Sequence, residues 1–236
     1  MKLVVLRLFI CSILFYACTA SNEQPAEASS DQDALINSIN TFKETAENGD
    51  LITRLGNDIL SYQIKLLNDS SKRYSHAGLV IEKNGQKLVA HITPAAEGAD
   101  TIQYTPIDSF INPANNLACA LYRFKLTASE KASLSSNIES YKIAGVYFDR
   151  LYDLDTDSSM YCTELILKAL QKATNNRITA RAIPVPKPMY KLLAGYFKNE
   201  KNIEKLIAQR RYIPIDNLYR NPECSFVMQL NFKTTP

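Results

Sequence analysis

Two strand-forming runs around an Asn-Gly pair constrain this chain more than any other feature of its sequence. The runs cover residues 75–82 and 87–93, and Asn84-Gly85 lies between them. Asn-Gly flanked by β-rich segments is the strongest short-range signal for a hairpin with a two-residue turn. With the turn at this pair, Glu82 faces Lys87, and their opposite charges support the register.

The hairpin separates an apolar face from a face that carries both histidines of the chain. The apolar face would hold Ala77, Leu79, Ile81, Leu88, Ala90 and Ile92. On the other face, His76 and His91 become diagonal neighbours about 6–8 Å apart at their Cβ atoms, and Gly78 leaves space between them. One imidazole could then orient the other. Two half-exposed histidines without a function are the alternative interpretation.

The remaining pattern predicts an α+β domain in which an antiparallel sheet packs against helices. Expected strands cover residues 51–53, 101–105, 117–125 and 226–232. Expected helices cover 32–47, 59–67, a segment after Thr127, 160–172 and 189–196. Thr127 and Glu130 have the spacing of a capping box, which marks the start of the third of these helices.

The first residues predict export. Residues 1–17 combine Lys2 and Arg7 with an apolar run that is too short to span a membrane, which indicates a signal peptide. Ala17 before Cys18 resembles a bacterial lipobox, so Cys18 is the expected lipidation site, with ordinary secretion and an uncleaved anchor as alternatives. Residues 18–31 are polar and aperiodic and predict a flexible tether. Residues 32–236 would form one domain, held at the cell envelope by the lipid and facing the periplasm or the cell surface.

Charge and composition argue against several classes of function. The chain has 27 Lys and Arg against 24 Asp and Glu, a formal net charge of +3, and no long basic run, so we expect no nucleic-acid partner. It has only 7 Gly and lacks a Gly-rich phosphate loop, a His-Glu-x-x-His motif and a Cys-x-x-Cys pair. We therefore expect no cofactor and no metal. Asp153, Asp155 and Asp157 lack the Gly and Glu of a calcium loop.

Cys162 is the candidate nucleophile among the cysteines of the folded part. Cys119 lies in a buried-strand pattern and is either a small apolar residue or the disulfide partner of Cys224. A cap at Ser158 or Ser159 would place Cys162 in the first turn of a helix. There the helix dipole and free backbone amides would lower the thiol pKa from about 8.5. A helix-start thiolate with a His base is the arrangement of Cys–His catalysis, and a buried structural thiol is the alternative.

Several segments resemble the permuted papain-like amidases of the YaeF/YiiX type, which are relatives of NlpC-type cell-wall peptidases. They are Ser75-His76-Ala77-Gly78, Val89-Ala90-His91, Tyr161-Cys162-Thr163-Glu164-Leu165 and the opening segment Asn48-Gly49-Asp50-Leu51-Ile52. The histidines precede the cysteine, which is the order that marks the permutation. The resemblance covers residues 49–232 and implies a circularly permuted papain-like (NlpC-like) fold.

The resemblance also implies roles for individual residues. Cys162 would be the nucleophile, His76 the general base and His91 the orienting residue. Glu164 matches the family motif but points away from Cys162, two residues along the helix, which implies a structural or substrate-contacting role. Tyr161 would line the cleft or pack. The implied reaction is hydrolysis of a peptide or other amide, cell-wall or lipid derived, through a thioester on Cys162.

Two other functions are compatible with the same residues. Permuted papain-like folds resembling this chain include lipid acyltransferases and phospholipases, and a membrane-tethered enzyme would meet acyl lipids. A non-catalytic envelope lipoprotein could instead bind peptide or glycan in the same cleft. In that case Cys162 would be an ordinary thiol, and binding would survive the substitution Cys162→Ala.

Overall fold

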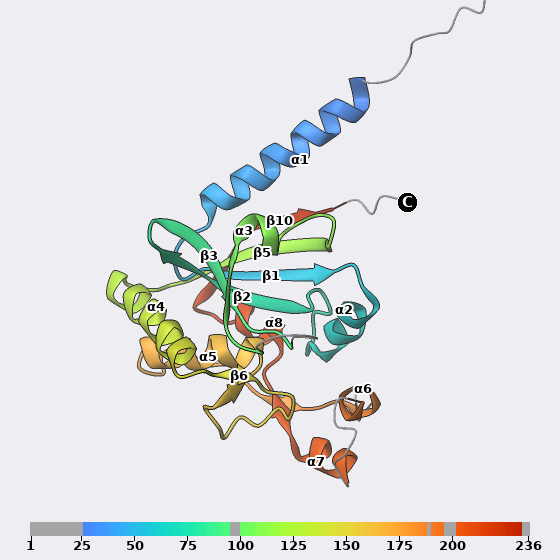
Figure 1. Cartoon of the computed structure of the whole chain (residues 1–236), viewed down its shortest axis with the longest axis vertical. Helices are drawn as coiled ribbons and strands as arrows, with labels where there is room; N and C mark the ends of the chain where they lie inside the picture. Colours follow the sequence, from blue (N-terminus) through green and yellow to red (C-terminus); the bar gives the residue numbers. More distant parts are fainter. Residues whose placement is uncertain (1–25, 95–99, 188–189, 196–201, 233–236) are drawn as a thin grey trace, which may run out of the picture. The chain divides into compact units, whose positions relative to one another are not determined.

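A six-stranded antiparallel sheet carries the candidate site (Figure 1). Its order is β10-β5-β1-β2-β3-β4, and every neighbouring pair is antiparallel. The strands are β1 (Leu51–Gly56), β2 (His76–Lys83), β3 (Gln86–His91), β4 (Gln103–Pro106), β5 (Asn116–Phe124) and β10 (Cys224–Asn231). The expected α+β class with an antiparallel sheet is therefore confirmed.

The computed structural model describes residues 26–94, 100–187, 190–195 and 202–232. The chain divides into two compact units, Met1–Ile36 and Asn37–Pro236, and every candidate catalytic residue belongs to the second. The predicted signal peptide, the predicted lipidation site Cys18 and Met189 lie outside the described residues. Within those residues, none of the helices has the length and apolar character needed to cross a bilayer.

The hairpin forms in the expected register. Glu82 pairs with Lys87, and the ladder between β2 and β3 runs from Lys83–Gln86 to Leu79–Ala90. Asn84 and Gly85 both have positive φ, 53° and 73°, the conformation that a tight two-residue hairpin turn requires. Because side chains alternate along a strand, this register also decides which residues share a face with His76.

Helices and short strand pairs complete the fold. The helices are α1 (Ala26–Thr45), α2 (Ile59–Ile64) continued by a 3-10 turn (Lys65–Leu67), α3 (Ile107–Phe110), α4 (Ala128–Ile143), α5 (Cys162–Ala173), α6 (Tyr190–Ala194), α7 (Ile203–Gln209) and α8 (Ile215–Tyr219). Two-residue strands β6 (Tyr147–Phe148) and β7 (Ser159–Met160) pair in parallel, and β8 (Ile183–Pro184) and β9 (Arg211–Tyr212) pair antiparallel. The Thr127–Glu130 capping box at the start of α4 is confirmed.

The N-terminal helix corrects one expectation. Residues 18–31 are predicted to be a flexible tether, but α1 begins at Ala26, so residues 26–31 are helical. Ala26, Glu27 and Ala28 open the helix, and Ala and Glu have high intrinsic helix propensity. Propensity thus favours the first three residues of this extension, whereas Ser29, Ser30 and Asp31 are weaker helix formers.

The apolar face of the hairpin packs as expected. Leu79, Ile81 and Ala90 belong to the main core, together with Leu134 of α4 and Leu165 of α5. Figure 1 shows α4 and α5 side by side on one side of the sheet, in agreement with the contacts between them and between α5 and β2. This packing holds the start of α5 near the start of β2, where His76 lies.

The three cysteines of the described residues are free. A disulfide between Cys119 and Cys224, one of the two expectations for Cys119, is therefore wrong. Cys119 pairs with Leu230, whereas Cys224 pairs with Phe124 at the other end of the same two strands. Five residues along β5 correspond to about 17 Å, far beyond the reach of a disulfide. Cys119 is instead a fully buried apolar residue.

Candidate active site

Cys162 is the first residue of α5. Its helix is capped by Tyr161, so the expected cap at Ser158 or Ser159 is wrong. The reason is that Ser159 and Met160 form β7 and pair with Tyr147 and Phe148, which holds them extended. Cys162 still lies in the first turn, and the amides of Cys162, Thr163 and Ala77 favour the thiolate.

His76 and His91 are in direct contact, as the hairpin register predicts. Nε2 of His76 lies 3.0 Å from Nδ1 of His91. Nε2 of His91 lies 2.8 Å from Oγ1 of Thr105 on β4. The ring of Phe110 packs against both imidazoles, with centroid distances of 5.7 Å and 5.2 Å. Sequence reasoning missed Thr105 and Phe110, because no local pattern shows that β4 is the neighbour of β3.

Gly78 permits this contact. A Cβ atom at position 78 would lie 2.5 Å from Cγ1 of Val89, 2.9 Å from the carbonyl oxygen of Ala90 and 3.2 Å from Cβ of His91. All three neighbours belong to β3 and are buried, so they cannot move freely. The expectation that Gly78 leaves space beside His91 therefore agrees with the structure, and its role is structural.

Gly78→Ala is expected to destabilise the protein by about 2 kcal/mol, the usual cost of overpacking a well-packed position. The free energy of unfolding is measured by urea titration monitored by circular dichroism. Because the new methyl group also presses on His91, the spacing of the two imidazoles should change. An unchanged urea midpoint for the Ala variant would contradict this prediction.

Arg54 is a further site residue that sequence reasoning missed. It lies on β1 directly opposite His76 on β2, and its guanidinium carbon lies 4.8 Å from the centroid of the Phe110 ring. Register places Arg54 on the same face as His76. A single Arg in a short strand has no pattern that distinguishes it from an exposed charge, so the sequence offers no signal for it.

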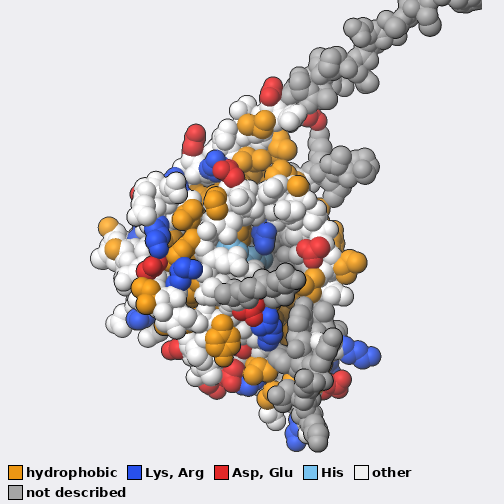
Figure 2. Space-filling view, viewed as in Figure 1, with side chains coloured by type: hydrophobic (Ala, Val, Ile, Leu, Met, Phe, Trp, Pro, Cys, Tyr) orange, Lys and Arg blue, Asp and Glu red, His pale blue; other side chains and the backbone are white. Residues whose placement is uncertain are grey.

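Cys162, His76 and Arg54 line one pocket of about 290 Å³. Most of the other lining residues are apolar and include Ile64, Leu67, Ile92, Phe148, Leu193 and Ile213. A small area of histidine surface (pale blue) reaches the face shown in Figure 2. The contacts of the described residues contain no hydrogen bond between the Cys162 sulfur and His76. Hydrogen bonds of catalytic pairs are often long without substrate and tighten when it binds.

The electrostatics of the site correct the expectation of a thiolate. Burial raises the pKa of the Cys162 thiol to about 11 and outweighs the backbone amides and Arg54, which lower it. Burial likewise holds the pKa of His76 well below its usual range, assisted by His91 and Arg54, and lowers the pKa of His91 to about 4. At neutral pH the resting site therefore contains a neutral thiol and two neutral imidazoles.

Alkylation of Cys162 by iodoacetamide is expected to accelerate continuously between pH 7 and pH 10, because the thiolate fraction grows about tenfold per pH unit below a pKa of about 11. The rate constant is read by mass spectrometry of the Cys162 peptide, and circular dichroism checks that the protein stays folded. Glutathione is the reference thiol. A rate that levels off below pH 7 would instead reveal a thiolate–imidazolium pair and contradict the prediction.

Tyr161 and Glu164 both support the helix start. Tyr161 lines the pocket, and its hydroxyl accepts a 2.8 Å hydrogen bond from the backbone amide of Ile213. Glu164 is fully buried and forms a 3.0 Å ion pair with Lys168 one helical turn later. Burial raises the pKa of Glu164 to about 7. Glu164 is absent from the pocket lining.

Comparisons with known proteins agree with this geometry. The family model of permuted papain-like amidase enzymes, YaeF/YiiX, C92 family, matches residues 45–192. The chain belongs to the permuted papain-like amidases. Among solved structures, the crystal structure of metalloprotein YiiX from Escherichia coli O157:H7 is similar, with 19% identity and a TM-score of 0.60 over 78% of this chain and 97% of that chain. None of the curated proteins matches the chain.

The Escherichia coli relative is described as a metalloprotein. In the present chain, residues 26–94, 100–187, 190–195 and 202–232 contain no group of three or more His, Cys, Asp or Glu side chains that could hold a metal ion. The described residues therefore do not fit a metal site with three or more such ligands.

Proposed function

We propose that this chain is a cysteine hydrolase that cleaves an amide with Cys162 as nucleophile, His76 as general base and His91 as orienting residue. One observation carries the proposal: Cys162 starts a helix in the same pocket as His76, whose Nε2 is held by His91. A nucleophile, a base and a group that orients the base are the three parts that covalent acyl transfer needs.

The hydrogen-bond chain is consistent with this role for His76. If Nε2 of His76 donates to Nδ1 of His91, then Nε2 of His91 donates to the Thr105 hydroxyl. In this arrangement Nδ1 of His76 carries a lone pair and can accept the thiol proton. The direction of the chain thus decides whether His76 is competent as a base.

The proposed reaction has two steps. The Cys162 sulfur bonds to the amide carbonyl carbon while His76 takes the thiol proton, and the C–N bond breaks as His76 returns that proton to the leaving amine. Water then attacks the thioester carbon while His76 takes a proton from the water. The C–S bond breaks, His76 returns the proton to the sulfur, and a carboxylic acid leaves while the Cys162 thiol is regenerated. Backbone amides at the start of α5 would stabilise the negative oxygen of each intermediate.

The test uses p-nitrophenyl acetate, an activated acyl donor, with the full chain. We expect release of nitrophenolate, an acetyl adduct that maps to Cys162 by mass spectrometry, and turnover that falls about 10²-fold or more in His76→Ala. A chain that forms no adduct at Cys162, or forms it equally fast without His76, would contradict the proposed function.

The apolar lining of the pocket favours a second candidate, a lipid acyl hydrolase or acyltransferase with the same Cys162 chemistry. Six of the lining residues named above are aliphatic or aromatic, and such a surface would suit an acyl chain. p-Nitrophenyl decanoate distinguishes the candidates. A kcat/KM at least about tenfold above that for the acetate would favour the lipid function, and equal values would favour a peptide or small amide.

We also propose that the enzyme acts at a bacterial envelope on a peptidoglycan-type peptide or a related amide, anchored through a lipid on Cys18. The support is the signal-peptide pattern of residues 1–17 followed by Ala17-Cys18. Labelling with a radioactive fatty acid in a bacterial host should mark the wild-type chain and spare Cys18→Ala. Equal labelling, or none, would reject the anchor.

A further inference from the structure

Among the described residues, Arg54, Arg73, Arg211 and Arg220 form no ion pair, and of these four only Arg54 lines the pocket of Cys162. Among the residues that the structure describes, no carboxylate lies within ion-pair distance of Arg54, whereas Arg123, Arg150, Arg177, Arg181 and Arg210 all form ion pairs. Asp58, which shares the pocket, is instead bonded to the backbone amide and hydroxyl of Ser61 at 2.9 Å and 2.7 Å.

Arg54 is also partly buried, which makes an unpaired charge costly. It lies in an apolar pocket and contacts the ring of Phe110, and burial lowers its pKa below the ordinary arginine value. Phe110 and the charge of Asp58 return part of the hydration free energy that this desolvated cation loses. No carboxylate binds the guanidinium directly, so the rest is uncompensated in the resting protein. An anion that enters the pocket would return it.

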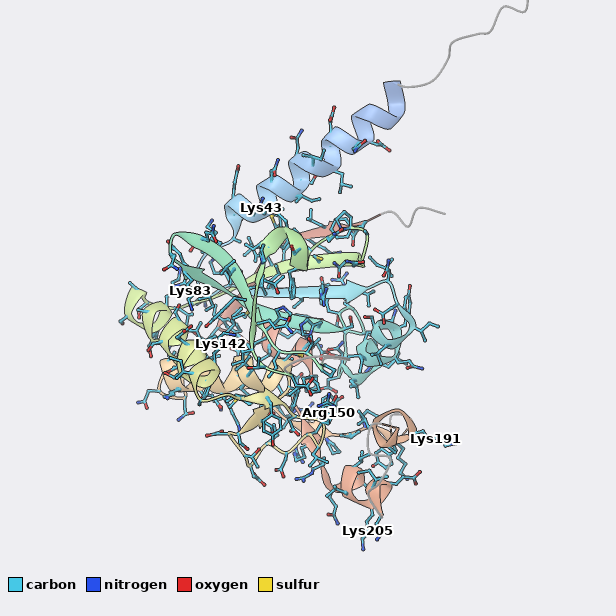
Figure 3. The ribbon with its side chains drawn as sticks, viewed as in Figure 1. Lys43, Lys83, Lys142, Arg150, Lys191 and Lys205 are labelled. Carbon is cyan, nitrogen blue, oxygen red and sulfur yellow. The ribbon has the colours of Figure 1, made fainter. Side chains whose placement is uncertain are left out.

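Arg54 lies close enough to the nucleophile for its charge to affect the sulfur. Its positive charge favours the Cys162 thiolate and disfavours protonation of His76 and His91. Arg150, labelled in Figure 3, lines the same pocket but is paired with Asp100. Of the two cations that line this pocket, Arg54 is therefore the one available to a ligand placed beside Cys162.

We propose that Arg54 binds a carboxylate of the substrate next to the bond that Cys162 attacks, while an apolar part of the same substrate occupies the rest of the pocket. The inference rests on the proposed function and narrows its substrate class to acidic, partly apolar acyl compounds. A planar guanidinium suits a carboxylate because it can offer two parallel N–H donors.

Two alkylating reagents that differ in charge test the proposal without a known substrate. Iodoacetate carries a carboxylate beside its reactive carbon, and iodoacetamide is its neutral analogue. The rate constants of both with Cys162 are measured in the full chain at pH 8.5 by mass spectrometry. Their ratio is divided by the ratio for glutathione, which removes the intrinsic difference between the reagents.

We expect the normalised iodoacetate-to-iodoacetamide ratio to be about tenfold above one in the wild type and to fall with added salt. Arg54→Gln should return it to about one, and Arg54→Lys should retain part of it. The control Arg220→Gln, an exposed arginine outside this pocket, should retain it. If Arg54 only stabilised the thiolate, Arg54→Gln would slow the reactions of both reagents equally and leave their ratio unchanged.

A wild-type ratio near one, or a ratio unchanged in Arg54→Gln, would overturn the proposal. The salt titration needs no variant, so the test survives if Arg54→Gln does not fold. Failure of the proposed function is separate, because it is read from the p-nitrophenyl acetate adduct. A high ratio without acylation would leave an anion site beside an inactive thiol.

Discussion

Replacing Cys162 with Ala is expected to lower the turnover of p-nitrophenyl acetate by about 10⁴-fold or more. Without the sulfur no thioester can form, and the remaining groups can only assist direct attack by water, which gives a small fraction of the covalent rate. Initial rates of nitrophenolate release measure the effect. Cys162→Ser should retain little of the activity, because a hydroxyl has a much higher pKa than a thiol and His76 is a weak base in this site.

Cys224→Ala is the matched control, since Cys224 is also a free cysteine but is absent from the pocket lining. It should leave turnover within about twofold of the wild type. If Cys162→Ala turned over the ester as fast as the wild type, the hydrolysis would come from other groups and the acyl-enzyme mechanism would be wrong. Ligand binding that survives Cys162→Ala, with no ester turnover above the uncatalysed rate in the wild type, would support the non-catalytic binding function.

Asp216→Ala is expected to lower the free energy of unfolding by about 3 kcal/mol, and the melting temperature by about 6–12 °C. Asp216 is fully buried at the start of α8. Its carboxylate accepts hydrogen bonds from the backbone amides of Asp69, Ser70 and Ser71 at 2.9, 2.7 and 2.8 Å. Removal of the carboxylate leaves three backbone donors without partners.

Thermal unfolding followed by circular dichroism measures this loss. The control is Asp108→Ala, which removes an exposed carboxylate paired with Lys43 and should cost about 0–1 kcal/mol. The loop of residues 69–71 that Asp216 holds leads into β2 and His76. The turnover of p-nitrophenyl acetate by Asp216→Ala should therefore fall as well. Equal melting temperatures for the two variants would show that the buried carboxylate contributes no more than the exposed one.

The sequence was sufficient for the parts of the protein that depend on neighbours in the chain. Asn84-Gly85 and the alternating side chains around it predict the register, the apolar face and the approach of His76 and His91, and the structure confirms each. The Thr127–Glu130 capping box also needs only local contacts. The motifs around His76 and Cys162 were enough to indicate the family, because each is a short continuous segment and the two follow one another in a characteristic order along the chain.

The tertiary structure decided what depends on distant segments. Pairing of β7 with β6 moves the start of α5 to Cys162, and the position of β4 brings Thr105 to His91. Local sequence predicts that a helix start lowers the Cys162 pKa, but burial by segments far along the chain reverses the direction. The same burial separates Arg54 from exposed arginines. Desolvation depends on everything that surrounds a group. Only the folded chain therefore determines the pKa of Cys162 and the free-energy cost of the Arg54 charge.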